Sequence, residues 1–124
     1  MLEITEQAIK KILPNDGPSI KEVKKYLKKY NEEYIVIKCG GSVLVNKDLF
    51  NNFIHNISIL NKLGFIPVII HGGGKRISSK LEESGIKSNF INGLRVTDEK
   101  SIVIVDEVLN IFNEEITNSL RNNG

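Results

Sequence analysis

Two glycine clusters are the residues whose types and spacing could do chemistry in this sequence. Residues 38–42 read Lys-Cys-Gly-Gly-Ser and residues 71–74 read His-Gly-Gly-Gly. Each cluster follows a short apolar run and precedes a stretch with helical spacing, so each is expected to join a strand to a helix. Glycine lets backbone amides approach an anion closely, and a helix N-terminus adds partial positive charge. Together the two clusters favour a site that handles phosphate.

Two familiar phosphate motifs do not fit these clusters. Neither has the spacing or the Gly-Lys-Ser/Thr ending of a P-loop. Their glycines are contiguous, whereas the dinucleotide fingerprint is Gly-x-Gly-x-x-Gly, so a nicotinamide-dependent enzyme is disfavoured.

Two cationic side chains lie near the clusters. Lys38 could neutralise phosphoryl oxygens in a transition state, or it could reach solvent as an ordinary strand-end lysine. Arg95 follows a predicted hairpin turn at Asn92-Gly93. Its guanidinium could bind a carboxylate through two hydrogen bonds, or it could pair with Asp98 on the surface.

Three further side chains are expected to be structural. His71 has no second histidine or carboxylate cluster nearby in the sequence, which favours a hydrogen-bonded structural role over catalysis or metal binding. His55 is expected to be exposed on a helix. Cys39 has no evident base beside it, so we interpret it as a small packed residue rather than a reactive thiol. No metal site is predicted.

The elements that must position these residues alternate from Tyr34 onward. Strands are predicted at 34–37 and 66–70, both as β-branched runs buried on both faces. Alternating strands and helices imply an α/β fold with parallel pairing and right-handed crossovers. The carboxyl ends of such strands form a ligand crevice, and both glycine clusters fall there.

Helix boundaries are marked by capping residues. Asn46 and Gly64 should bound one helix, Gly85 should end the next, and Thr97 or Asp98 should start a long final helix. The final helix is expected to bury one apolar stripe: Ile102, Val105, Leu109, Phe112, Ile116 and Leu120.

Residues 1–33 differ in character and are predicted to form a helical extension. A helix is expected over 5–13, and a capping box at Ser19 and Glu22 should start a second. The second helix has a thin apolar stripe that suits docking on a neighbour, while its lysines form a solvated face.

Composition bounds the remaining possibilities. The chain has 124 residues, of which 40% are hydrophobic and 26% are charged. This length and composition are typical of a single globular domain. A net charge of +2 and 6% aromatic residues give little support to a nucleic-acid surface. No run approaches the roughly 20 apolar residues of a membrane span, and the first residues do not resemble a signal peptide. With one cysteine, these features predict a cytoplasmic chain.

Three motifs together resemble the amino acid kinase family in order and spacing: residues 38–42, residues 71–74, and Gly-Leu-Arg-Val-Thr-Asp at 93–98. The third motif is the most specific and resembles the N-acetylglutamate kinases. The resemblance covers residues 34–124. It implies an amino-acid-kinase-like parallel-sheet sandwich, present in part and preceded by N-terminal helices. This chain would hold the N-terminal half, which binds the acyl amino acid, and the C-terminal ATP-binding half would be absent.

The resemblance also implies roles for individual residues. It implies that Lys38 is catalytic and stabilises the transferring phosphoryl group. It implies that three glycines cradle nucleotide phosphate: Gly40, Gly41 and Gly72. It implies that three residues bind the acyl substrate: Gly73, Gly74 and Arg95, the last through the α-carboxylate of N-acetyl-L-glutamate. Magnesium-ATP would be the phosphoryl donor for the γ-carboxylate, with no tightly bound cofactor, in arginine biosynthesis.

The expected partners are further copies of the chain or a complementary C-terminal half. The N-terminal helices resemble, by position, the extra helix of arginine-inhibited members that joins dimers into hexamers. A half would be inactive alone. Two other function classes stay open: a non-catalytic module that binds an acyl amino acid or arginine, and an oligomerisation module that docks on a full-length kinase.

Overall fold

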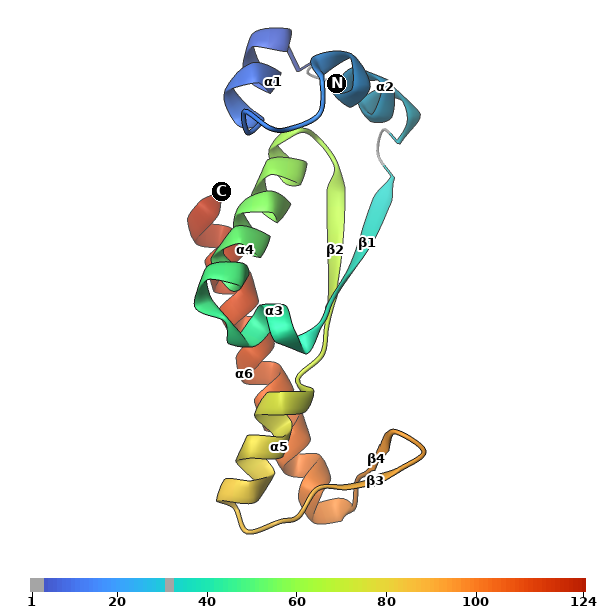
Figure 1. The fold of residues 1–124 in the computed structure, drawn as a ribbon, viewed down its shortest axis with the longest axis vertical. Coiled ribbons are helices and arrows are strands. Elements are labelled where there is room, and N and C mark those ends of the chain that lie inside the picture. Colours follow the sequence, from blue (N-terminus) through green and yellow to red (C-terminus); the bar gives the residue numbers. More distant parts are fainter. Residues whose placement is uncertain (1–3, 31–32) are drawn as a thin grey trace.

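The computed structural model of the chain describes residues 4–30 and 33–124. Across these residues six helices and four strands form an elongated molecule (Figure 1). In chain order the elements are α1 (Glu6–Ile12), α2 (Ile20–Lys29), β1 (Tyr34–Cys39), α3 (Gly41–Val45), α4 (Lys47–Lys62), β2 (Ile66–His71), α5 (Gly74–Glu83), β3 (Asn89–Ile91), β4 (Leu94–Val96) and α6 (Glu99–Asn123).

The two long strands pair in parallel, as the alternation of strands and helices predicts. β1 and β2 are in register from Tyr34 opposite Ile66 to Cys39 opposite His71. α4 is the helix of the crossover between them. Because both strands end at the same edge, the two glycine clusters begin side by side.

The main core lies between the sheet and two helices. α4 and α6 pack on one face of β1 and β2, around Phe112 and Ile116 of α6, Ile54 of α4 and Cys39 of β1. α4 begins at an Asn46 cap, as predicted. It ends before Gly64, whose φ of +94° is a conformation that glycine adopts without a steric penalty.

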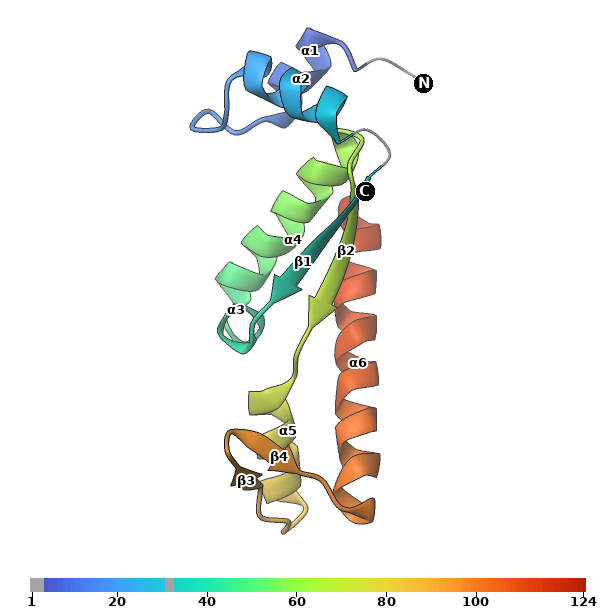
Figure 2. The same cartoon turned by 90° about the vertical axis from the view of Figure 1, so that its right-hand side faces the viewer.

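The other face of the sheet is open, which makes the prediction of strands buried on both faces wrong. Tyr34 is 71% exposed, Val36 62% and Ile70 53%. Figure 2 looks toward this face, with both helices lying behind the strands. Alternate residues of a strand point to opposite faces. The apolar run therefore correctly predicted two apolar faces, but whether a face is covered depends on other elements.

α6 packs on α5 at its first turns and on the sheet and α4 farther along. Asp98, rather than Thr97, caps it by accepting from the amide of Ser101. The predicted burial of Phe112 and Ile116 is confirmed, whereas Ile102 is 51% exposed and its predicted burial is wrong. Among the described elements, only α5 and the residues after it flank the start of α6, so Ile102 finds no covering layer.

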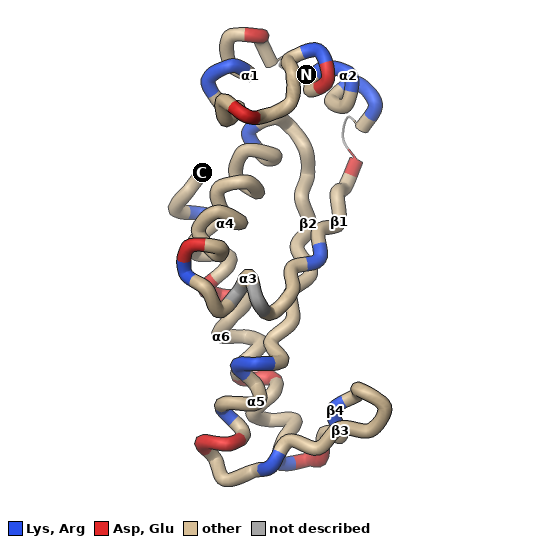
Figure 3. Tube along the Cα trace, viewed as in Figure 1, with Lys and Arg blue, Asp and Glu red and all other residues tan. Residues whose placement is uncertain are grey.

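The N-terminal helices pack at the end of α4, and the apolar stripe predicted for the second helix takes part in this contact through Val23. Ile9 of α1 and Val23 of α2 are buried with Leu63 and Phe65. The capping box of Ser19 and Glu22 is present. Figure 3 shows that both helices carry basic positions along the chain, with a few acidic ones among them. Within the described ranges, no helix is both long and apolar enough to cross a membrane.

Candidate functional site

Helix caps distinguish the two glycine clusters from the rest of the molecule. α1, α2, α4 and α6 each begin with a side chain that accepts a hydrogen bond from a first-turn amide. α3 and α5, which follow β1 and β2, have Gly40 and Gly73 at their N-caps and have no such bond. Their first amides are therefore not satisfied by a cap side chain. An anion at the N-terminus of α5, a ten-residue helix, would meet free donors and the positive end of the helix dipole.

Backbone strain does not explain why glycine occupies these five positions, and packing explains it only at Gly73. A Cβ atom at Gly40, Gly41, Gly72 or Gly74 would meet no described atom within 4 Å. None of these four residues has a positive φ. Gly73 is the exception, since its Cβ would lie 3.0 Å from Cδ2 of Leu109. The open space above the other four is room for another molecule to approach the backbone.

Arg95 is joined to the second glycine cluster. It lies on β4, in a hairpin whose turn is formed by Asn92 and Gly93 as predicted. Its Nη2 donates to the carbonyl oxygen of Gly74 at 3.2 Å and to Oγ of Ser78 at 2.8 Å. Among the described residues it makes no ion pair with Asp98, which caps α6 instead. The structure thus brings Arg95 and the loop 72–74 together.

The structure does not join Lys38 to this group. Lys38 is exposed and lies one residue before the end of β1, opposite Ile70. Strand alternation puts it on the open face of the sheet, with Tyr34 and Val36. In the described part of the chain, no hydrogen bond or ion pair links Lys38 to the glycines or to Arg95.

His71 makes a packing contact, Cys39 is buried and His55 is exposed. The His71 ring packs edge-on against Phe112, with centroids 5.2 Å apart, and its Nδ1 lies 3.4 Å from the carbonyl oxygen of Gly72. Cys39 is buried, and burial raises the pKa of its thiol, so the reactive thiolate is disfavoured. His55 is exposed.

Four residues near the site were not predicted from the sequence. Ser78, Ser88 and Phe90 surround the guanidinium of Arg95, with the ring centroid of Phe90 4.7 Å from it. Arg76 lies 4.0 Å above the ring centroid of Phe112. Serine is common on helix and loop surfaces, so no sequence signal distinguishes Ser78 or Ser88 from other serines.

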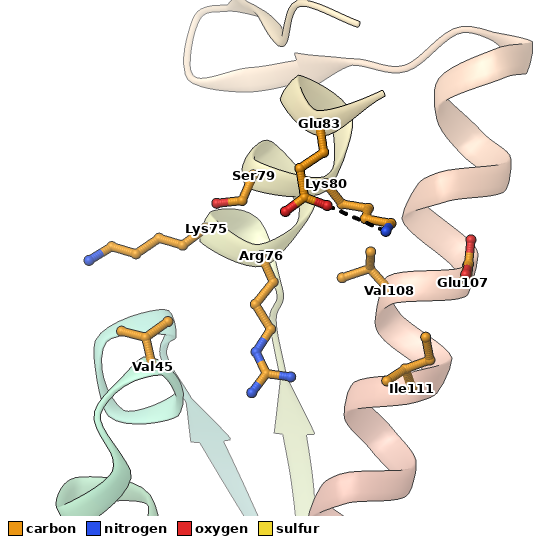
Figure 4. Close-up of a pocket in the computed structure, with 9 residues that line it drawn as sticks. All are labelled: Val45, Lys75, Arg76, Ser79, Lys80, Glu83, Glu107, Val108 and Ile111. Carbon is orange, nitrogen blue, oxygen red and sulfur yellow. Dashed lines mark hydrogen bonds and ion pairs between the residues drawn. The ribbon is translucent and has the colours of Figure 1, made fainter. Parts of the chain in front are cut away.

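One cavity of the molecule does not coincide with this site. A pocket of about 360 Å³ lies between α5 and α6, and Figure 4 shows its lining. Its charged groups are largely paired: Arg76 with Glu115 at 2.7 Å, and Lys80 with Glu83 at 3.4 Å. Lys75 points away from α6. Neither Lys38 nor Arg95 lines the pocket, so its volume does not identify the candidate site.

Known sequences match the chain over nearly its whole length. The profile of the amino acid kinase family matches residues 33–124. The chain is 61% identical over 120 residues to the acetylglutamate kinase of Pelagibacter ubique (strain HTCC1062), covering 97% of this chain and 42% of that protein. It is 43% identical over 99 residues to the acetylglutamate kinase of Campylobacter jejuni subsp. jejuni (strain ATCC 700819), covering 80% of this chain and 36% of that protein. The chain therefore spans about two fifths of the length of these relatives.

Solved structures share the fold. N-acetylglutamate synthase from Neisseria gonorrhoeae, complexed with coenzyme A and N-acetyl-glutamate, superposes with a TM-score of 0.69 at 22% identity, over 86% of this chain and 26% of that chain. The protein smu.665 from Streptococcus mutans UA159 gives a TM-score of 0.57 at 35% identity, over 73% of this chain and 37% of that chain. Because the family profile matches most of the chain and includes both glycine clusters and the Arg95 hairpin, the chain belongs to the amino acid kinase family.

Proposed function

We propose that residues 34–124 form the acyl-amino-acid-binding half of an acetylglutamate kinase, with residues 1–33 as a helical extension. The reaction is phosphorylation of the γ-carboxylate of N-acetyl-L-glutamate by magnesium-ATP. Support comes from the relatives, which bear the name acetylglutamate kinase at 61% and 43% identity. The synthase of similar fold was solved with N-acetyl-glutamate.

One observation carries the proposal. Of the six described helices, the two that follow the parallel strands lack side-chain caps. Arg95 donates to the carbonyl oxygen of Gly74, the first residue of the second of these helices. In the proposed arrangement, a site for phosphate therefore lies next to a site for a carboxylate. A kinase that transfers a phosphoryl group to one end of a dicarboxylate needs this combination.

In the proposed mechanism, an oxygen of the γ-carboxylate attacks the γ-phosphorus of ATP. A P–O bond forms to the substrate, and the bond to the bridging oxygen of ADP breaks, giving an acyl phosphate and ADP. The free amides at Gly73 and Gly74 would stabilise the charge on the phosphoryl and acyl oxygens. Arg95 would hold the α-carboxylate, and Lys38 would approach the phosphoryl group once nucleotide is bound.

We further propose that turnover needs residues that contact the nucleotide. These residues would lie in the part of the relatives that this chain does not match. The matched segment is 36–42% of their length. Turnover would be assayed as ADP release by the chain alone and with the remaining C-terminal portion of the Pelagibacter ubique relative added. ADP release that appears only with both pieces supports this division, and equal release by the chain alone contradicts it.

The main test is calorimetric titration of the chain with N-acetyl-L-glutamate. We expect saturable binding. Arg95→Ala should weaken it roughly 100-fold or more, because each hydrogen bond to a charged group contributes about 1.5–3 kcal/mol. Arg121→Ala is the matched control, since Arg121 is exposed near the end of α6. A folded chain that does not bind the ligand, or an Arg95→Ala variant that binds it as well as the wild type, would refute the proposal.

A further inference from the structure

The guanidinium of Arg95 is held by two serines from different parts of the chain. Its Nη1 donates to Oγ of Ser88, in the loop before β3. Its Nη2 donates to Oγ of Ser78 on α5 at 2.8 Å and to the carbonyl oxygen of Gly74 at 3.2 Å. The ring of Phe90 lies under the group, 4.7 Å from it. The charge is therefore fixed in place by four contacts.

These contacts determine where the serine hydroxyl hydrogens can point. A guanidinium can only donate hydrogen bonds, so both serine oxygens act as acceptors toward Arg95. Each hydroxyl keeps its own hydrogen, and neither donates it to any described protein group. Of the five N–H donors of a guanidinium, three are used by Ser78, Ser88 and Gly74, which leaves two. Both serines are only partly buried, so a ligand can reach them.

We propose that Ser78 and Ser88 complete the carboxylate site of Arg95. They position the guanidinium and donate their hydroxyl hydrogens to the same carboxylate that Arg95 binds. This proposal rests on the proposed function, in which Arg95 binds the α-carboxylate of the substrate. The carboxylate would then accept hydrogen bonds from two neutral hydroxyls and from the free N–H groups of one cation.

The arrangement also sets the spacing between the two ends of the substrate. Gly74 and Ser78 are four residues apart on α5 and therefore lie on the same face of the helix. The first two turns of α5 thus carry the free amide of the proposed phosphoryl site and the hydroxyl of the proposed carboxylate site. The hydrogen bond from Arg95 to Gly74 ties the two sites together. A ligand whose two carboxylates match this spacing is selected, which makes Ser78 and Ser88 specificity-determining positions.

The test compares two ligands on serine variants of the whole chain by calorimetry. N-acetyl-L-glutamate carries the α-carboxylate, and its α-amide analogue does not. We expect Ser78→Ala and Ser88→Ala each to weaken binding of the acid roughly 10- to 100-fold, the loss for one hydrogen bond to a charged group. Binding of the amide should change by much less, because the carboxylate that the serines recognise is missing. Ser78→Thr, which keeps a hydroxyl, should restore most of the affinity for the acid.

Ser79→Ala is the matched control, since Ser79 neighbours Ser78 on α5, is exposed and makes no described contact with Arg95. It should leave binding of both ligands unchanged. If the wild-type chain binds neither ligand, the proposed function and this inference both fail. If the wild type binds the acid and both alanine variants bind it equally well, the inference alone fails. Equal losses for the acid and the amide would also overturn it, because the serines would then support the local fold without contacting the carboxylate.

Discussion

Replacing Gly74 with alanine should make the protein more stable and make it bind its ligand less well. Gly74 is the first residue of α5, its φ is not positive, and an added Cβ would meet no described atom within 4 Å. Alanine restricts the unfolded chain and favours the helix, by about 0.4–1 kcal/mol at compatible sites. At a first helical position we expect the lower part of this range, about 0.5 kcal/mol of added stability.

The same methyl group would occupy the space above the free amides of α5. If the substrate approaches the backbone there, the methyl should weaken binding of N-acetyl-L-glutamate roughly 10-fold or more, since closely approaching groups lose their hydrogen bonds. Urea unfolding gives the stability and calorimetry gives the affinity. Both are measured on the same preparation of Gly74→Ala.

Gly73→Ala is the matched comparison, because its stability should change in the opposite direction. Its Cβ would lie 3.0 Å from Cδ2 of Leu109 and 3.4 Å from Cδ1 of Ile77, so these two side chains must give way by a few tenths of an ångström. Such overpacking costs about 1–3 kcal/mol. A Gly74→Ala variant that is destabilised by more than about 1 kcal/mol, or that is stable and binds normally, would refute the view that Gly74 is kept for a ligand.

Two further predictions concern the core and the helix caps. Phe112 is 1% exposed, so Phe112→Ala should lower the free energy of unfolding by about 3–5 kcal/mol in urea. Phe90→Ala, on the exposed hairpin, should cost less than about 1 kcal/mol, and equal losses would show that Phe112 is not central to the core. The hydrogen bond from Ser19 favours the charged carboxylate and holds the pKa of Glu22 below its ordinary 4.5. The contribution of this bond to the stability of the folded protein is therefore present above pH 4.5 and is lost as the pH falls through the lowered pKa. The helical circular dichroism signal should therefore fall further for the wild type than for Glu22→Gln between about pH 5 and about pH 3, and identical curves would contradict a role for the capping box.

Features set by neighbouring residues could be predicted from the sequence. The caps at Ser19 and Asn46, the helix end at Gly64 and the hairpin turn at Asn92-Gly93 each depend on a side chain or a backbone angle within a few residues. Parallel pairing also followed, since a helix between two strands permits little else. The glycine clusters meet at one edge of the sheet for the same reason.

Features set by distant residues could not be predicted. Arg95 binds Gly74 and Ser78, which are 21 and 17 positions away, and the sequence suggested a pairing with Asp98 only because that residue is close along the chain. The open face of the sheet is a similar case, because an apolar strand does not reveal which elements cover it. α3 was not predicted either: five residues, two of them β-branched valines, carry no clear helical period.

The hairpin of β3 and β4 has little of its own to hold it in place. Its strands have three residues each, and Leu94 is 76% exposed. A two-stranded ribbon of this kind is marginal in water. Among the described residues, the side-chain hydrogen bonds that tie it to α5 both come from Arg95. Amide protons of the hairpin should therefore exchange with solvent through local opening of the hairpin. The exchange rate should depend on whether the hydrogen bonds of Arg95 to α5 are formed, and not on unfolding of the whole molecule. Hydrogen exchange at Leu94–Val96 would thus report directly on whether the proposed carboxylate site is occupied.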